Sequence, residues 1–253
     1  MGRHIYEMYQ PHRKVIIPPG HDSLQTVASL LAKYQSGDYF AYEREGVWHI
    51  GLSNHASLRV DPQGKTATID DSGNQDVFSI TGPLSELARK FTSEHLQPDG
   101  KMFGQAGFNY GAHVRGQTYS PGRWPILSLM IPITEVTLEP DQINLKSRDE
   151  KHLSEVCDYI DKAVTYNIRH PEPVNTQCHE KKYMNQVAQA VKEIKARQYT
   201  KVIMSRAIDL EKRVDIPATL LNGRRSNTPA RTFALNHGGY QATGFSLELV
   251  VSV

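Results

Sequence analysis

Cysteine is scarce in this chain. Among its 253 residues there are two cysteines, Cys157 and Cys178, so the sequence can form one disulfide at most. A secreted scaffold held together by several disulfides is therefore excluded. Two free thiols are typical of a protein in a reducing compartment, so we interpret both cysteines as unpaired and expect a cytoplasmic location.

Long apolar runs and an excess of one charge are also lacking. The most apolar stretch, Trp124–Ile133, has ten residues and is interrupted by Ser128 and Pro132. A membrane-spanning helix needs about 20 apolar residues, and the N-terminal stretch MGRHIYEMYQPHRK has no apolar core of a signal peptide. Lys plus Arg number 29 and Asp plus Glu number 27, which gives a formal net charge of +2. We therefore predict neither a membrane nor a nucleic acid as partner.

Motifs of several common enzyme chemistries are absent or incomplete. Gly104, Gly107 and Gly111 do not have the spacing of a phosphate-binding loop. The tripeptide Gly244–Ser246 begins like the nucleophile elbow G-x-S-x-G, but Glu248 stands where the second glycine is needed. None of the eleven histidines has the H-x-x-x-H spacing of a zinc-binding helix. The sequence therefore disfavours a nucleotide-phosphate site, a serine hydrolase and a zinc enzyme.

What is present is the composition of a globular protein. Hydrophobic residues make up 39 % and charged residues 22 % of the chain, which excludes a mainly disordered protein, a collagen and a coiled coil. Apolar residues at helical spacing predict helices over 22–34, 84–91, 149–164 and 183–198, the first with Asp22 and Gln25 as a capping box. Runs rich in β-branched and aromatic residues predict strands over 38–45, 47–53, 57–60, 66–70, 101–110, 126–138, 142–147, 200–210, 240–246 and 247–253, and a loop followed by a strand within 222–236.

These elements predict an α+β fold in two parts. The first 147 residues have the pattern of a mostly antiparallel sheet with packed helices. Two prolines make His170–Gln177 the best linker candidate, which separates an N-terminal α+β subdomain over 1–170 from a second part over 178–253. The apolar strand at Leu249–Val253 has no following sequence to cover it. We therefore expect a chain that is truncated at its C-terminus and that can self-associate through this exposed strand.

Two charged residues stand in apolar strand patterns. Lys201 begins a run of Val, Ile and Met, where desolvation can lower the pKa of a lysine enough for it to act as a base. The structural alternative is a lysine that extends from a strand end into solvent. Glu248 interrupts the run GFSLELVV and, by alternation, lies on the same side as Ser246 and Val250. A raised pKa would make it a proton donor, whereas a carboxylate at a sheet edge is the alternative.

The arginines allow structural and functional interpretations. Arg224, Arg225 and Arg231 form a small basic patch, for which a solvated loop is favoured over an anion contact. Arg206, next to Ser205, is interpreted as structural at a strand end, with contact to an anion as the alternative.

Three segments carry a resemblance to a known family. YTKVIMSR (199–206) resembles the strand motif KV-[IV]-x-SR of the chorismate-utilising enzymes, and the helix pattern before it matches theirs. GFSLELVVSV (244–253) resembles their motif G-x-S-P-E-x-L-V, with Leu247 in place of the proline. Lys201 and Glu248 are 47 residues apart, which also fits the family. The intervening GRRSNTPARTFAL is most similar to the salicylate synthases of siderophore pathways.

The resemblance implies an anthranilate-synthase-component-I-like fold and a function. Lys201 would be the general base that activates water to attack carbon 2 of chorismate, and Glu248 the general acid that protonates the departing 4-hydroxyl. A salicylate synthase then eliminates pyruvate from isochorismate. An isochorismate synthase and a catalytically inactive fragment or pseudoenzyme are the alternatives. Amination of the anthranilate type is disfavoured, because the ammonia-using relatives carry Gln at the position of Lys201.

The resemblance also implies a cofactor. Mg²⁺ is the metal of the family, and the glutamates that bind it belong to the part of the family that this sequence does not match. We therefore expect no metal ligands in this chain and interpret 178–253 as the incomplete start of the chorismate-binding catalytic region.

Overall fold

The structure of the chain is a computed structural model that describes residues 11–18, 20–167 and 180–246. Cys178, the predicted linker at 170–177 and the predicted strand at 247–253 lie outside the described residues. Within the described part of the chain, no helix has the length and apolar character needed to cross a membrane.

The chain divides into two compact units. Residues 1–167 and 216–253 form the first, and residues 168–215 form the second. This division differs from the predicted parts 1–170 and 178–253, because strand β9 (Arg231–His237) pairs with strand β2 (Tyr39–Arg44) and so joins the first unit. The predicted catalytic region is therefore distributed over both units.

Most helices and strands of the structure lie where the sequence patterns predict them, and a few elements are additional. The strands are β1 (His12–Ile16), β2, β3 (Val47–Val60), β4 (Thr66–Asp71), β5 (Asn74–Ser79), β6 (Phe103–Ala106), β7 (Leu127–Leu138), β8 (Gln142–Ser147), β9 and β10 (Tyr240–Ser246). The helices are α1 (Ser23–Lys33), α2 (Leu84–His95), α3 (Tyr110–Val114), α4 (Glu150–Asp161), α5 (Glu180–Lys195) and α6 (Ile216–Ser226). The sequence did not predict β1 and β5, and the predicted strands 47–53 and 57–60 are one continuous strand, β3.

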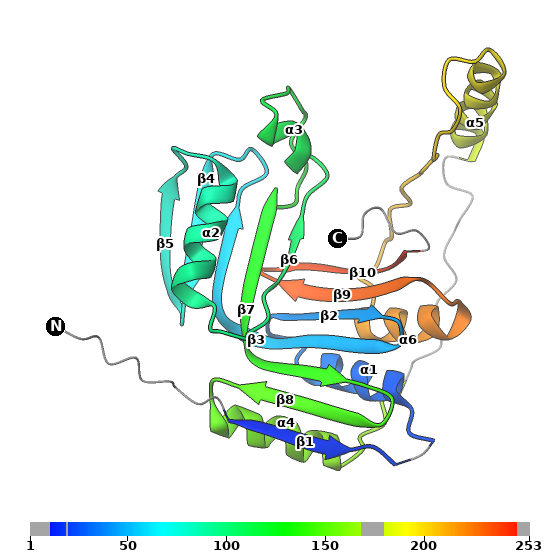
Figure 1. Cartoon of the computed structure of the whole chain (residues 1–253). Coiled ribbons are helices and arrows are strands. Elements are labelled where there is room, and N and C mark those ends of the chain that lie inside the picture. Colours follow the sequence, from blue (N-terminus) through cyan, green and yellow to red (C-terminus); the bar gives the residue numbers. More distant parts are fainter. Residues whose placement is uncertain (1–10, 19, 168–179, 247–253) are drawn as a thin grey trace. The chain divides into compact units, whose positions relative to one another are not determined.

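An antiparallel sheet forms the centre of the first unit (Figure 1). Its order is β1-β8-β7-β3-β2-β9-β10, with β4 and β5 added beside β3 and with β6 paired to β7. The long strand β3 pairs with β7 along almost its whole length, while its first half pairs with β2 and its second half with β4. A register shift between Asn54 and Ala56 marks a bulge, and Ser53 there has a φ of 61°. This bulge lets one strand continue through NHA, where the sequence pattern predicts a break.

The main core lies between the sheet and helices α1, α4 and α6. Alternation along β2 directs Tyr39 and Ala41 into this core and Phe40 and Tyr42 to the opposite face. The helices contribute apolar stripes, among them Val27, Leu30 and Leu31 of α1, Leu153, Val156 and Ile160 of α4, and Ile216 and Leu220 of α6. Each fully buried side chain of this size contributes about 1.5–3 kcal/mol to folding. A second core forms where α2 packs Leu84 and Phe91 against β3 and β4.

The predicted capping box on α1 is half confirmed. The side chain of Asp22 accepts a hydrogen bond from the backbone N–H of Gln25 at 3.0 Å, as an N-cap residue does. The side-chain amide of Gln25 instead donates to the backbone carbonyl of Tyr166 at 2.8 Å. Gln25 therefore attaches the segment after α4 to the start of α1.

The predicted solvated loop at NGRRS is wrong. These residues are the last turns of α6, whose Leu220 and Leu221 are fully buried. Arg224 forms an ion pair with Glu43 and Arg225 one with Asp22, each at 2.7 Å. The buried apolar stripe and the two carboxylates stabilise a helix that the local sequence does not indicate by itself.

The predicted strand at 200–210 is also wrong for this structure. Residues 201–210 have neither helical nor strand geometry, and Val202 and Ile203 are 42 % and 71 % exposed. A strand needs a neighbour for its backbone hydrogen bonds. Among the described residues no strand pairs with this segment.

The last residue of β9, His237, is a buried histidine. His237 is 3 % exposed, and its Nδ1 lies 2.8 Å from the hydroxyl oxygen of Ser128 on β7. Burial lowers the pKa of His237 to about 4; the carboxylates of Asp38 and Asp70 oppose this shift, and Arg59 adds to it. His237 is therefore neutral in the folded protein at pH 7.

We predict that the free energy of unfolding decreases as the pH falls from about 6.5 to about 4. An unfolded histidine takes up a proton below about pH 6.5, whereas His237 in the fold resists protonation down to about pH 4. Between these two pH values the unfolded state therefore binds more protons than the folded state. The resulting loss of unfolding free energy due to His237 approaches ~1.4 kcal/mol per pH unit. Urea unfolding followed by circular dichroism across this pH range measures the slope.

The variant His237→Gln is the control for this prediction. Gln can still hydrogen-bond to Ser128 but does not titrate, so its stability should depend less steeply on pH. Burial also lowers the pKa values of His49, His55 and His152. Part of the pH dependence of stability should therefore remain in the variant. Parallel curves for the two proteins would contradict the role of His237.

Candidate active site

Lys201 lies in the second unit and is exposed. The residues on either side of it contact helix α5: the Tyr199 hydroxyl donates to the carboxylate of Glu193 at 2.7 Å, and Met204 lies against the same helix face. Arg206 places its guanidinium over the ring of Tyr183, 5.6 Å from the ring centre. This cation–π contact supports the structural interpretation of Arg206.

Glu248 lies outside the described residues. The described part of its motif is the end of β10, Gly244–Ser246, which pairs with Arg231–Phe233 of β9. The roles of Lys201 and Glu248 therefore stay predictions.

The side chains of β10 alternate between two different environments. Ala242 lines a cavity, and the ring of Phe233 lies directly over Gly244 on the same face. Tyr240, also on this face, contacts the ring of Trp124 with 5.1 Å between ring centres. Phe245 points the other way and contacts α6. Tyr240, Ala242 and Gly244 thus lie on the sheet face that carries the cavity, and Ala242 lines it.

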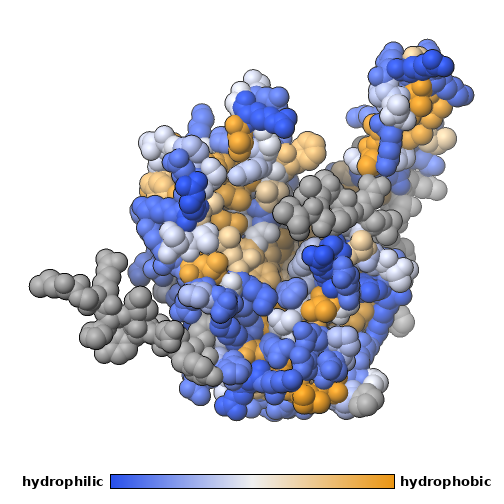
Figure 2. All heavy atoms as spheres, viewed as in Figure 1, coloured by the Kyte–Doolittle hydropathy of each residue, from blue (hydrophilic) through white to orange (hydrophobic). Residues whose placement is uncertain are grey.

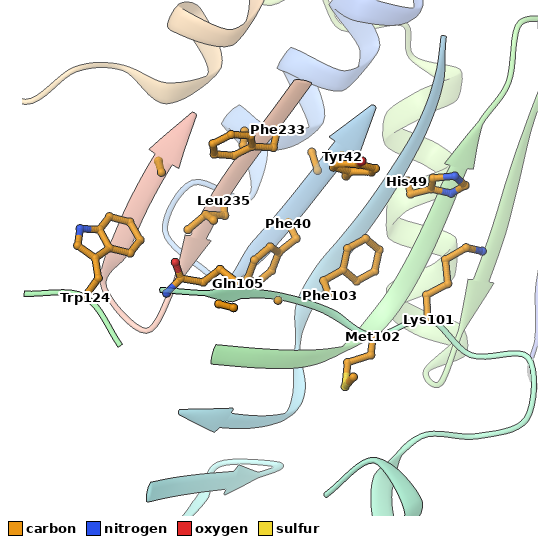
Figure 3. Close-up of a pocket in the computed structure, with 15 residues that line it drawn as sticks. Phe40, Tyr42, His49, Lys101, Met102, Phe103, Gln105, Trp124, Phe233 and Leu235 are labelled. Atoms are coloured by element: carbon orange, nitrogen blue, oxygen red, sulfur yellow. The ribbon is translucent and has the colours of Figure 1, made fainter. Parts of the chain in front are cut away.

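The cavity lies on the sheet face opposite α1, α4 and α6 and has a volume of about 830 Å³ (Figure 3). Its lining is mostly apolar and aromatic and includes Phe40, Tyr42, Met102, Phe103, Trp124, Phe233 and Leu235. Figure 2 shows apolar side chains gathered in a hollow on this face of the first unit. Volume and lining are typical of a site for an apolar ligand or for the apolar side chains of another polypeptide.

Lys101 and His49 line one end of the cavity, and Gln105 lines it beside Trp124 (Figure 3). The backbone N–H of Lys101 donates to Glu135 Oε1 at 2.8 Å, and its ammonium lies 3.8 Å from Glu135 Oε2. Lys101 also donates to the hydroxyl of Thr137 at 3.4 Å. Burial lowers the pKa of His49, and the nearby Lys101 adds to this shift. The positive charge of Lys101 is thus already balanced by Glu135 at this end of the cavity.

Sequence reasoning missed this cavity, although β2 carries a signal for it. In YFAYE, Tyr39 and Ala41 face the helices, yet Phe40 and Tyr42 on the other face are also apolar or aromatic. A strand that is apolar on both faces indicates that both faces of the sheet are to be covered. Phe233 and Leu235 of β9 repeat this signal.

The described residues do not provide a magnesium site. Among them no group of three His, Cys, Asp or Glu side chains is arranged to hold a metal ion. Mg²⁺ prefers a nearly octahedral set of oxygen ligands that includes carboxylates. The donors present do not fit this ion, and no chemical step below is assigned to it.

Comparison with known proteins identifies the family. The sequence model described as chorismate binding enzyme matches residues 37–253. The chain belongs to the chorismate binding enzyme family. The resemblance predicted from YTKVIMSR and GFSLELVVSV is thereby confirmed, and the predicted combination of helices with antiparallel sheet is confirmed as well.

One relative of this chain is the salicylate synthase of Mycolicibacterium paratuberculosis (strain ATCC BAA-968 / K-10). The two sequences are 29 % identical over 234 residues, which cover 92 % of this chain and 51 % of that protein. The chain thus spans about half the length of the curated relative that it matches.

We predict that the cavity binds an apolar dye such as anilinonaphthalene sulfonate with saturable fluorescence. The variant Ala242→Phe should weaken the signal severalfold, because the added ring enters the cavity that Ala242 lines. Fluorescence titration measures the change, and circular dichroism checks that the variant is folded.

The matched control is Gln75→Phe on the exposed strand β5, which adds the same ring away from the cavity. Equal dye binding by both variants and the wild type would show that the dye does not enter this cavity.

Proposed function

We propose that this protein is a salicylate synthase-like enzyme that acts on chorismate. The observation that carries the proposal is the match to a salicylate synthase over 92 % of this chain. The reaction would proceed through isochorismate and end in salicylate and pyruvate. We propose in addition that the salicylate serves siderophore synthesis in the cytoplasm and that the described elements are the first part of an anthranilate-synthase-component-I-like fold.

Two proton transfers would drive the first step. Lys201 would take a proton from water as the water oxygen bonds to carbon 2 of chorismate. Glu248 would give a proton to the 4-hydroxyl, which leaves as water. Such assistance is needed because water is a weak nucleophile and hydroxide a poor leaving group. Since one water enters and one leaves, this step is an isomerisation.

The second step, elimination of pyruvate, needs no further acid or base from the chain in our proposal. It is a pericyclic rearrangement, for which the site mainly holds the reactive conformation of isochorismate. The same Lys201 and Glu248 would therefore matter for the first step more than for the second.

The strand β10 supports the proposed role of Glu248. Sequence alternation assigns Glu248 to the side of Ser246, and Ala242 on that side lines the apolar cavity. A carboxyl group in apolar surroundings keeps its proton to a higher pH, as a general acid requires. Lys201 is exposed in this structure. We propose that bound substrate covers it, because desolvation favours the neutral amine of a lysine base.

We predict that the protein incubated with chorismate and Mg²⁺ forms salicylate and pyruvate. Lys201→Gln and Glu248→Gln should each lower the rate by about 10²–10⁴-fold, the usual range for loss of general acid–base catalysis. Lys201→Gln supplied with ammonia tests whether amination replaces hydration. Chromatography of the products and coupled detection of pyruvate provide the measurement.

Lys192→Gln and Glu45→Gln are matched controls, because both remove a charge from an exposed side chain outside the proposed site. They should keep the wild-type rate. Loss of activity in these controls, or retained activity in both site variants, would contradict the assigned roles. Isochorismate as the only product would favour an isochorismate synthase.

A catalytically inactive fragment or pseudoenzyme is the second candidate. Two observations favour it: the chain spans about half of its curated relative, and the described residues hold no group of metal ligands. For this candidate we expect no product from a folded sample and concentration-dependent self-association in sedimentation velocity runs. A protein that stays monomeric and turns over chorismate would rule it out.

A further inference from the structure

Three neighbouring strands place a row of residues under helix α6. In the antiparallel register Glu43 of β2 lies beside Thr232 of β9, and Thr232 lies beside Phe245 of β10. Glu43 is 4 % exposed and Thr232 is fully buried. Two consecutive residues of α6, Gly223 and Arg224, contact the two ends of this row. The helix therefore connects β2 to the final described strand.

The first contact is an ion pair between the partly exposed Arg224 and the buried carboxylate of Glu43. Arg224 donates from Nε to Glu43 Oε2 at 2.7 Å and from Nη2 to Glu43 Oε1 at 2.9 Å. This two-bond geometry fixes the direction of the guanidinium as well as its distance. Arg224 also donates to the carbonyl of Asn227 at 3.1 Å, and the Asn227 side chain donates to the carbonyl of Gly223 at 2.8 Å. The C-terminal turn of α6 is thus held at a fixed position over β2.

The second contact, between Gly223 and Phe245, requires a glycine in the helix. A Cβ atom on Gly223 would overlap the ring of Phe245, so only glycine lets the ring lie against the helix. Glycine inside a helix is unfavourable compared with alanine. Its presence here is explained by the close approach of Phe245.

The position of Phe245 relates this contact to the proposed site. Phe245 is the penultimate described residue of β10 and precedes Glu248 by three positions in the sequence. A side chain that is anchored at this point limits how far the end of the β9–β10 hairpin can move. We propose that Gly223 and Arg224 form a clamp that holds the end of β10 and so positions the segment carrying Glu248. The link to Glu248 rests on the proposed function, whereas the clamp itself rests on the described contacts.

Hydrogen exchange tests the clamp without any assay of activity. In Gly223→Ala the amides at the end of β10 should exchange about tenfold faster, while those of β1 and β8 keep their rates, because only the hairpin loses its anchor. Helix propensity alone would stabilise α6 in this variant, so faster exchange must come from displacement of Phe245. Mass spectrometry of peptic peptides resolves the two regions.

Four further variants sharpen this test. Adding Phe245→Leu to Gly223→Ala should restore slow exchange in β10, since the smaller side chain leaves room for the new methyl group. Gly111→Ala in α3 is the matched control, because no atom lies within 4 Å of the added methyl group. Arg224→Met should also accelerate exchange in β10, and combining it with Glu43→Gln should reverse part of this effect by removing the unpaired buried charge.

Steady-state kinetics then tests the link to Glu248. Gly223→Ala should lower kcat for chorismate about tenfold with little change in KM, and the added Phe245→Leu should restore kcat. If the wild-type chain forms no product, the proposed function fails, and the hydrogen-exchange measurement alone then tests the clamp. Unchanged exchange in β10, or equal acceleration in β1 and β8, would overturn the clamp whatever the activity.

Discussion

The pairing of β3 with β7 is the interaction on which the rest of the first unit depends. These are the longest strands described, with 14 and 12 residues, and they pair from Trp48 opposite Leu138 to Val60 opposite Leu127. The two halves of β3 have different second neighbours, β2 and β4, so each half organises its own part of the sheet. The helices follow this division: α1, α4 and α6 cover one part and α2 covers the other. A bulge between the two halves is therefore a structural requirement of this arrangement.

Charged groups inside this apolar framework are placed in pairs. Glu43 is matched by the two hydrogen bonds of Arg224, and Glu135 by the backbone and the ammonium of Lys101. A buried carboxylate without such partners would be costly, so each pair also fixes the position of the segment that supplies its cation. One of these segments is α6 and the other leads into β6. Both segments lie next to strands that line the apolar cavity. The two charge pairs therefore help to fix the shape of this largely apolar face.

Much of this fold was predictable from local patterns. The alternation in β8 and the helical spacing in α1, α2 and α4 each follow from burial on one side of an element, which the sequence records directly. The end of α6 was not predictable in this way, because the helix there is stabilised by Glu43 and Asp22, carboxylates far away in the sequence. The segment 201–210 shows the opposite case: its β-branched residues favour a strand, but a strand also needs a partner that no local pattern can supply. Lys201 and Glu248 were noticed as charged residues in apolar strand patterns, but their roles as a base and an acid came from the motif resemblance.

The pairing of β2 with β9 also has a consequence for the order in which the chain can fold. The side chain of Asn236 on β9 donates to the carbonyl of Gly37, 199 residues earlier in the chain. During synthesis β2 and β3 can form their hairpin early, but the second edge of β2 stays open until β9 has been made. Closing a loop of this length is slow, and an open edge invites pairing with other chains. The period of greatest risk for aggregation therefore falls before residues 231–237 leave the ribosome, and it ends when they dock onto β2.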